Sequence, residues 1–197
     1  GGEVSPTSVP EPASKPAAPS DTPKPAEPTT EPSATPESAA TQPPSAAFEI
    51  TSAAYADGEA VPDRYSCAGD DVSPPLSWSD PPAGTQTFAL IFDDPDAPAG
   101  TWIHWVLYQL PAETRALPEA ADSEDALPDG TLRGENSWGR GDYGGPCPPG
   151  GTHRYFFRLY ALDTTLDLES GANKEQLLAA MEGHVLAQAE LMGTYTK

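Results

Sequence analysis

The chain has few basic side chains for its length. Among 197 residues there are 10 lysines and arginines against 30 aspartates and glutamates, which gives a net charge of −20. Proteins that bind DNA or RNA gather basic residues into a patch that faces the phosphate backbone. Ten scattered cations among thirty carboxylates cannot form such a patch, so nucleic acid and unspecific attachment to anionic lipid are excluded as partners.

Long apolar runs are also missing from the sequence. A transmembrane helix needs about 20 consecutive apolar residues. No run here is longer than Phe88 to Phe92, which has the length of a buried strand. We therefore expect no transmembrane segment.

Cysteine is scarce, because the chain holds only Cys67 and Cys147. An even pair favours one disulfide in a protein that matures in an oxidising compartment. Two buried thiols are the alternative.

The first 45 residues lack aromatic side chains, and two valines are their only large aliphatic ones. They contain 12 of the 25 prolines of the chain. Such a segment buries too little apolar surface to offset the entropy of ordering it, so we expect residues 1–45 to form a disordered, partly polyproline II linker. The linker and the cysteine pair together favour an exported protein at the cell surface or in the periplasm, with a lipoprotein tether as one option.

Residues 46–197 are long enough for one domain with a substantial core. Aromatic and β-branched residues between Pro and Gly predict strands over 48–53, 87–93, 101–110 and 153–162. Only the end of the chain has helical spacing of apolar residues, from a cap at Asn173 to a stop at Gly193. Within that helix, His184 is assigned a structural role. Strands first and a helix last favour an antiparallel β-sandwich with peripheral helices.

An acidic turn follows the most apolar strand. Pro95 and Pro98 end the strand and make the turn rigid. Strand alternation places Asp94 on the same face as Phe92, where the buried face meets the turn, while Asp96 is positioned to hold the loop. Taken alone, both carboxylates are typical turn residues.

A histidine lies inside the apolar strand 101–110. Alternation divides this strand into two faces. One face is expected to carry Trp102, His104, Val106 and Tyr108, and the other Ile103, Trp105 and Leu107. A lone histidine in such a strand is more often a hydrogen-bonded structural residue than a ligand.

A loop rich in glycine and proline precedes the strand 153–162. Nine of the thirteen residues from Gly139 to Gly151 are Gly or Pro, so its backbone amides could approach a ligand closely. Alternation then places His153 and Tyr155 side by side on one face of the strand. A plain β-turn followed by a core tyrosine explains the pattern equally well.

Together, these three segments resemble the phosphatidylethanolamine-binding protein family, the group that includes Raf kinase inhibitor protein, and in particular its bacterial and archaeal branch. The resemblance runs from about Phe48 to Tyr195. It rests on the blocks Asp94-Pro95-Asp96-Ala97-Pro98, Trp102-Ile103-His104-Trp105, and Gly145-Pro146-Cys147-Pro148-Pro149 with His153-Arg154-Tyr155. Upstream, Tyr65-Ser66-Cys67 and Ser73-Pro74-Pro75-Leu76-Ser77-Trp78 support it.

The resemblance implies a mostly β fold, an antiparallel β-sandwich with peripheral helices and a C-terminal helix. It also implies a pocket at the end of the central sheet for phosphate, acetate or a phospholipid headgroup, with no cofactor. The implied ligand-binding residues are Asp94, His104, His153, Tyr155 and one of Pro148 or Pro149, with Asp96, Gly145 and Pro146 in support. Imidazole, phenol and loop amide groups would donate hydrogen bonds to the anion, and Asp94 would orient one imidazole.

Two other functions stay open at this point. His104, His153 and either Asp94 or Asp96 could form a metal site of a hydrolase or redox enzyme, since two histidines and a carboxylate suit Zn or Fe. Surface loops could instead inhibit a protease or kinase, as the resemblance allows. We favour a binding module, with regulation or inhibition of other proteins as one use of it, because the expected pocket has donors but no nucleophile beside a base.

Overall fold

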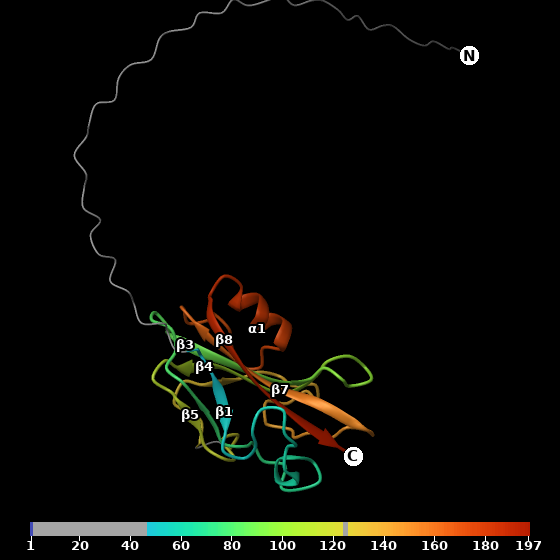
Figure 1. Ribbon diagram of the computed structural model, residues 1–197. Helices are drawn as coiled ribbons and strands as arrows, with labels where there is room; N and C mark the ends of the chain where they lie inside the picture. Colours follow the sequence, from blue (N-terminus) through green and yellow to red (C-terminus); the bar gives the residue numbers. More distant parts are fainter. Residues whose placement is uncertain (2–46, 124–125) are drawn as a thin grey trace, which may run out of the picture. The chain divides into compact units, whose positions relative to one another are not determined.

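Two antiparallel sheets form the framework of the fold (Figure 1). The computed structural model describes Gly1, residues 47–123 and residues 126–197, so the linker predicted for residues 1–45 lies, apart from Gly1, outside the described residues. The smaller sheet has the strand order β1-β2-β5, and the larger has the order β6-β4-β3-β7-β8. Every strand pair within them is antiparallel, which confirms the predicted mostly β fold.

The strands of the smaller sheet are β1 (Ile50–Ser52), β2 (Leu76–Trp78) and β5 (Ala116–Leu117). Those of the larger sheet are β3 (Thr87–Asp94), β4 (Trp102–Pro111), β6 (Leu132–Arg133), β7 (Thr152–Leu162) and β8 (Val185–Thr196). The described chain also contains a short 3-10 helix, η1 (Asp63–Tyr65), and the helix α1 (Lys174–Met181). The four strands predicted from the sequence correspond to β1, β3, β4 and β7. No helix in the described ranges is long and apolar enough to cross a membrane.

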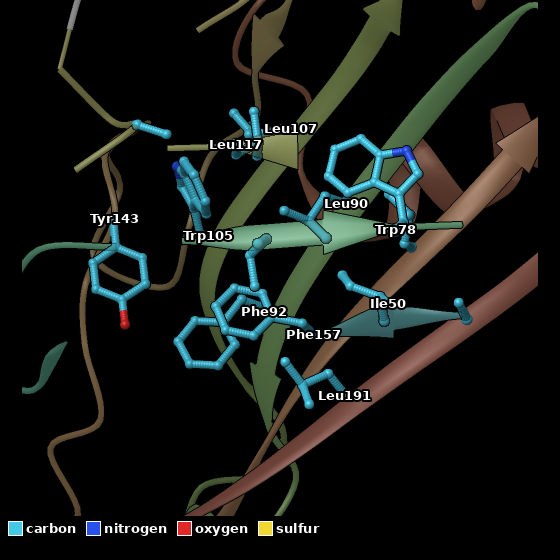
Figure 2. Close-up of a cluster of buried hydrophobic side chains, with 14 of the residues drawn as sticks. Ile50, Trp78, Leu90, Phe92, Trp105, Leu107, Leu117, Tyr143, Phe157 and Leu191 are labelled. Carbon is cyan, nitrogen blue, oxygen red and sulfur yellow. The ribbon is translucent and has the colours of Figure 1, made fainter. Parts of the chain in front are cut away.

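The middle strand of the larger sheet, β3, is buried along all eight of its residues. On one face its side chains, among them Leu90 and Phe92, pack against Ile50 and Trp78 of the smaller sheet (Figure 2). On the other face, Ala89 and Ile91 belong to a second apolar cluster that includes residues of α1. A strand covered on both faces must be apolar throughout, which is why 87–92 stands out in the sequence.

The helix α1 is shorter than the sequence predicted. Its cap is confirmed, because the Asn173 side chain accepts a hydrogen bond from the Gln176 backbone N–H and the Gln176 side chain accepts one from the N–H of Asn173. The helix ends at Met181, however, and Gly183 follows with a φ of 80°. The predicted continuation as a C-terminal helix to Gly193 is wrong, since this segment is β8.

The open edge of β7 explains why the end of the chain is a strand. The two strands pair from Thr152 opposite Thr196 to Leu162 opposite Val185. Short apolar segments often fit helical and alternating spacing alike, and here the pairing decides between them. Gly193, the expected helix stop, lies within β8, where a Cβ atom would come within 2.6 Å of the Val61 side chain.

A disulfide joins Cys67 to Cys147, with an S–S distance of 1.99 Å and a Cα–Cα distance of 5.5 Å. The alternative of two free thiols is therefore wrong. The bond fastens the loop after η1 to the glycine- and proline-rich loop before β7, and the backbone N–H of Cys67 also donates to the carbonyl of Pro146. The two loops are thus held together covalently and by the main chain.

The pairing of β8 makes a prediction about stability. Leu191 is 2% exposed and faces the core, so Leu191→Ala should lower the free energy of unfolding by roughly 2–5 kcal/mol. Leu186→Ala is the matched control, because Leu186 is 40% exposed, and it should cost less than about 1 kcal/mol. Urea unfolding followed by tryptophan fluorescence measures both. Equal losses would contradict the assignment of this segment to β8.

The disulfide makes a second prediction. It closes a loop with a sequence separation of 80 residues, so its removal frees considerable entropy in the unfolded chain. The double variant Cys67→Ser/Cys147→Ser should therefore lose about 2–5 kcal/mol of unfolding free energy. Urea unfolding of the variant and of the oxidised protein gives this difference. Coinciding unfolding curves would show that the bond does not stabilise the fold.

Candidate functional site

Asp94 and His153 meet at one end of the larger sheet. The Nδ1 atom of His153, near the start of β7, lies 2.7 Å from Oδ2 of Asp94, at the end of β3. Antiparallel neighbours bring the end of one strand beside the start of the next, which explains this contact between residues 59 apart. Both side chains are buried. The carboxylate can only accept, so Nδ1 carries the hydrogen and the ring is held in one orientation.

His104 reaches the same place through a β-bulge. Along β3 and β4 the pairing passes from Phe92 opposite Trp105 to Asp93 opposite Ile103, which leaves His104 as an extra residue. Two consecutive residues of β4 therefore face the same side. The His104 ring lies 5.3 Å from the ring of Phe92, within the core between the two sheets.

The bulge corrects the predicted faces of β4. Alternation grouped His104 with Val106 and Tyr108, but these two residues belong to the cluster beneath α1. His104 instead shares its side of the sheet with Trp105 and with the core between the sheets. The prediction was wrong because an inserted residue makes two consecutive side chains face the same side of the sheet. Simple alternation then assigns the residues on one side of the insertion to the wrong face.

The His104 ring is held by the loop before β7. Its Nδ1 atom lies 2.7 Å from the carbonyl oxygen of Gly144, so this nitrogen carries a hydrogen. Burial lowers the pKa of His104 below its ordinary value, and this outweighs the opposite influence of the Gly144 carbonyl and of the Asp94 charge. In the resulting neutral ring, Nε2 is an acceptor without a hydrogen.

Tyr155 lies beside both histidines. Its ring centre is 5.3 Å from that of His104 and 6.5 Å from that of His153. The hydroxyl is buried and has no hydrogen-bond partner in the described structure. Burial, and then the charge and the hydrogen-bonding influence of the Asp94 carboxylate, raise the pKa of Tyr155 well above its ordinary value, so the phenol keeps its hydrogen.

A cavity of about 300 Å³ opens in front of this group. Its lining consists of Asp94, Ala97, Pro98, Ala99, Trp102, His104, Trp138, Cys147 and Pro149. Three residues predicted for the site, Asp94, His104 and Pro149, therefore line the cavity directly. His153 and Tyr155 stand behind them, in contact with Asp94 and His104 respectively, and Pro148 is buried away from the lining.

Sequence reasoning missed one wall of the cavity. The ring of Trp138 stands edge-on to His104 at 5.1 Å and to Trp102 at 5.5 Å, and the residue is 43% exposed. Trp102 was assigned to a strand face but not to the site. A tryptophan inside the polar segment 135–141 was the one available signal, because a large aromatic residue in such a loop often contacts a ligand.

Asn136 shapes the loop that carries Trp138. Its Oδ1 atom accepts hydrogen bonds from the backbone N–H groups of Trp138 and Arg140. Its Nδ2 atom donates to the carbonyls of Asp142 and of His104. The Gly144 N–H donates to the same His104 carbonyl. The loop therefore provides the hydrogen-bond donors that the backbone carbonyl of the bulged residue does not find on β3.

The glycines of the second loop serve close packing. A Cβ atom at Gly144 would come within 2.5 Å of the Trp138 ring, and one at Gly145 within 2.3 Å of the Tyr65 carbonyl oxygen. The N–H of Gly144 is bonded to His104 and that of Gly145 to Oδ1 of Asp71. For these two residues, the expectation that loop amides are free to face a ligand is therefore wrong.

Asp96 fixes the acidic turn. Its carboxylate accepts two hydrogen bonds from the Arg154 guanidinium, at 2.8 and 2.9 Å, and one from the Arg154 backbone N–H. These bonds lower the pKa of Asp96 to about 2. The turn that supplies Ala97 and Pro98 to the cavity is thus tied to β7, in agreement with the supporting position expected for Asp96.

The metal site considered for this region is not supported by the side-chain arrangement. Across the described ranges, no three His, Cys, Asp or Glu side chains are grouped so that they could hold a metal ion. The Nδ1 atoms of His104 and His153 are both directed at protein acceptors.

Comparison with known proteins agrees with this geometry. The family model for phosphatidylethanolamine-binding proteins matches residues 51–196. A UPF0098 protein of Methanothermobacter thermautotrophicus is 53% identical over 144 residues, covering 73% of this chain and 95% of the relative. A UPF0098 protein of Chlamydia muridarum is 48% identical over 152 residues, covering 75% of this chain and 97% of the relative.

Solved structures show the same likeness. A crystal structure from Chlamydia trachomatis, described as a putative phosphatidylethanolamine-binding protein homologue, has a TM-score of 0.71 and 45% identity, and covers 78% of this chain and 99% of its own. The crystal structure of E. coli YbcL, described as a new member of the mammalian PEBP family, has a TM-score of 0.72 and 34% identity. The match covers 77% of this chain and 99% of YbcL. This chain therefore belongs to the phosphatidylethanolamine-binding protein family.

Proposed function

We propose that the domain binds a small anion, either phosphate or a phosphate-bearing headgroup, in the cavity lined by Asp94, His104 and Trp138. The observation that supports this most is the buried imidazole of His104 in the lining, with the imidazole of His153 bonded to Asp94, another lining residue. Each donates its Nδ1 hydrogen to the protein, so each has only Nε2 left for a ligand. An imidazole fixed in this way can donate to an anion once Nε2 is protonated.

An anion would provide hydrogen-bond acceptors for the donors of this site. An oxyanion provides acceptors only, and His104, which lines the cavity, becomes a donor at Nε2 once this nitrogen is protonated. Protonated Nε2 atoms would form charge-assisted hydrogen bonds, which are about twice as strong as neutral ones. The donor set thus fits an oxyanion better than a neutral polar ligand.

The apolar walls favour an anion that carries an organic group. Beside the imidazoles, the cavity is bounded by Trp102, Trp138 and the Ala97-Pro98-Ala99 segment. Bare phosphate would leave these walls in contact with water, whereas a headgroup would cover them. The family name of the matching model points to the same class of ligand.

The negative charge of the domain does not prevent this binding. Six of the 30 acidic residues and two of the 10 basic ones fall in residues 1–45, which leaves the domain with 24 against 8. At about 0.1 M salt, charges more than about 10 Å apart are largely screened, while hydrogen bonds act at contact distance. Overall charge therefore lowers the association rate at low salt more than it weakens the bound state.

The disulfide supports a proposal about location. Such bonds persist in oxidising compartments, and Cys147, which forms this one, also lines the cavity. We place the domain outside the cytoplasm, at the cell surface or in the periplasm, where it would meet headgroups or their soluble fragments.

The variant His104→Phe tests the proposed function. Phenylalanine keeps an aromatic ring among Phe92, Trp138 and Tyr155 but cannot donate to an anion. Loss of one charge-assisted hydrogen bond should weaken binding roughly 10- to 100-fold. Isothermal titration with phosphate and with phosphoethanolamine measures this, and thermal unfolding verifies the fold. His184→Phe is the control, because His184 is exposed, does not line the cavity, and forms its hydrogen bond with Asp163.

The pH dependence separates this role from a merely structural one. Since burial lowers the pKa of His104, the free protein holds it neutral at pH 7 and must take up a proton on binding. Affinity for sulfate, whose charge is constant over this range, should therefore rise as the pH falls from about 8 to about 6, and His104→Phe should flatten the curve. A wild-type affinity for sulfate that does not change with pH, or equal affinities of wild type and His104→Phe, would contradict the proposal.

A further inference from the structure

The disulfide between Cys67 and Cys147 lies at the surface of the domain. Both residues are exposed, and Cys147 also lines the cavity in front of His104. Exposed disulfides are more easily reduced than those that only stabilise a fold, and they are often the regulatory or catalytic bonds of a protein. This bond is therefore open to attack by a thiol.

The cavity brings this disulfide close to the group that we assign to the anion. His104 and Cys147 line the same space of about 300 Å³, and Trp138 and Pro149 bound it as well. The Nδ1 atom of His104 is bonded to the protein, which leaves Nε2 for the ligand. A small molecule that carries both an anionic group and a thiol would have a partner for each of them in this cavity.

Hydrogen bonds also join the two loops that carry the cysteines. The buried Tyr143 hydroxyl donates to the carbonyl of Tyr65 at 2.9 Å, and the backbone N–H of Cys67 donates to the carbonyl of Pro146 at 3.2 Å. These bonds do not depend on the disulfide. They would keep Cys67 beside Cys147 after the S–S bond opens, so that Cys67 can close the bond again.

We propose that Cys147 is a thiol-exchange site for small thiols that carry an anionic group, an inference that rests on the anion binding proposed above. The incoming thiol loses its proton to water, and its thiolate attacks the sulfur of Cys147. A new S–S bond forms between the ligand and Cys147 while the bond to Cys67 breaks, and Cys67 leaves as a thiolate that takes a proton from water. A second thiol then releases the ligand as its own disulfide, so that two thiols are oxidised and the protein disulfide is reduced to two thiols.

The charge of the domain makes this preference for an anionic thiol testable. With 24 acidic and 8 basic residues, the domain 46–197 repels anions and attracts cations. A disulfide that meets thiols only by collision from the solvent should therefore open fastest with a cationic thiol. Binding of the anionic group at His104 would reverse this order.

The probes are mercaptoethanesulfonate, which is anionic, mercaptoethanol, which is neutral, and cysteamine, which is cationic. Mass spectrometry of the full chain follows the opening of the disulfide. Each rate is divided by the rate of the same thiol with neutral hydroxyethyl disulfide, which removes differences in intrinsic reactivity. Mercaptoethanesulfonate should react about tenfold faster than cysteamine, with a rate that saturates and that phosphate inhibits. A relative rate that is not highest for the anionic thiol would overturn the proposal.

Variants locate the exchange. His104→Phe should remove the advantage of the anionic thiol and leave the order that the charge of the domain sets. Cys67→Ser leaves Cys147 as the only thiol, which should form a mixed disulfide faster with oxidised mercaptoethanesulfonate than with cystamine. Cys147→Ser is the matched variant, and its remaining thiol should show no such preference. The same preference in both cysteine variants would overturn the proposal, and thermal unfolding verifies that each variant is folded.

Isothermal titration with phosphate separates this inference from the proposed function. If phosphate binds but the anionic thiol has no advantage, the exchange site is wrong and the anion cavity stands. If phosphate does not bind, the anion cavity itself is wrong.

Discussion

The burial of β3 is the constraint on which the rest of the structure depends. This strand lies in the middle of the larger sheet, is covered on both faces, and ends on two consecutive aspartates, Asp93 and Asp94, that are 1% and 3% exposed. A buried carboxylate must be paired or it destabilises the fold, and neighbouring residues of a strand point to opposite faces. Each aspartate therefore needs positive partners on its own side of the sheet.

The two faces meet this need differently. On the side of α1, Asp93 accepts from Lys174, the first residue of the helix, at 2.6 Å and from Arg158 of β7 at 3.3 Å, and both are permanent cations. On the other side, Asp94 accepts from Nδ1 of His153 and from the backbone N–H of Asp96, and among the described residues no lysine or arginine forms an ion pair with it. Asp93 is thus neutralised by permanent cations, whereas Asp94 is not, and we propose that the ligand binds on the side of Asp94.

Much of this arrangement could be predicted from the sequence. Aromatic and β-branched runs between prolines and glycines identified four strands, and alternation correctly placed Asp94 at the buried end of β3 and His153 beside Tyr155. These features depend on residues close together in the chain. The cap at Asn173 belongs to the same class, because its partner Gln176 is three residues away.

Other features depend on distant residues and could not be predicted. The bulge at His104 is stabilised by Asn136 and Gly144, 32 and 40 residues further along, and nothing in 101–110 marks the inserted residue. Likewise, residues 185–192 satisfy a helix and a strand equally, and only the open edge of β7 selects the strand. Trp138 becomes a wall of the cavity only once Asn136 has folded its loop.

The central claim is that the two buried imidazoles act together on one anion. The direct measurement is an NMR titration of the three histidine ring signals of the chain with phosphate and then phosphoethanolamine. We predict that the Nε2 resonances of His104 and His153 shift together with one saturation curve, while the signals of exposed His184 stay in place. If all three histidines respond alike, or if His104 and His153 do not respond, the central claim is contradicted.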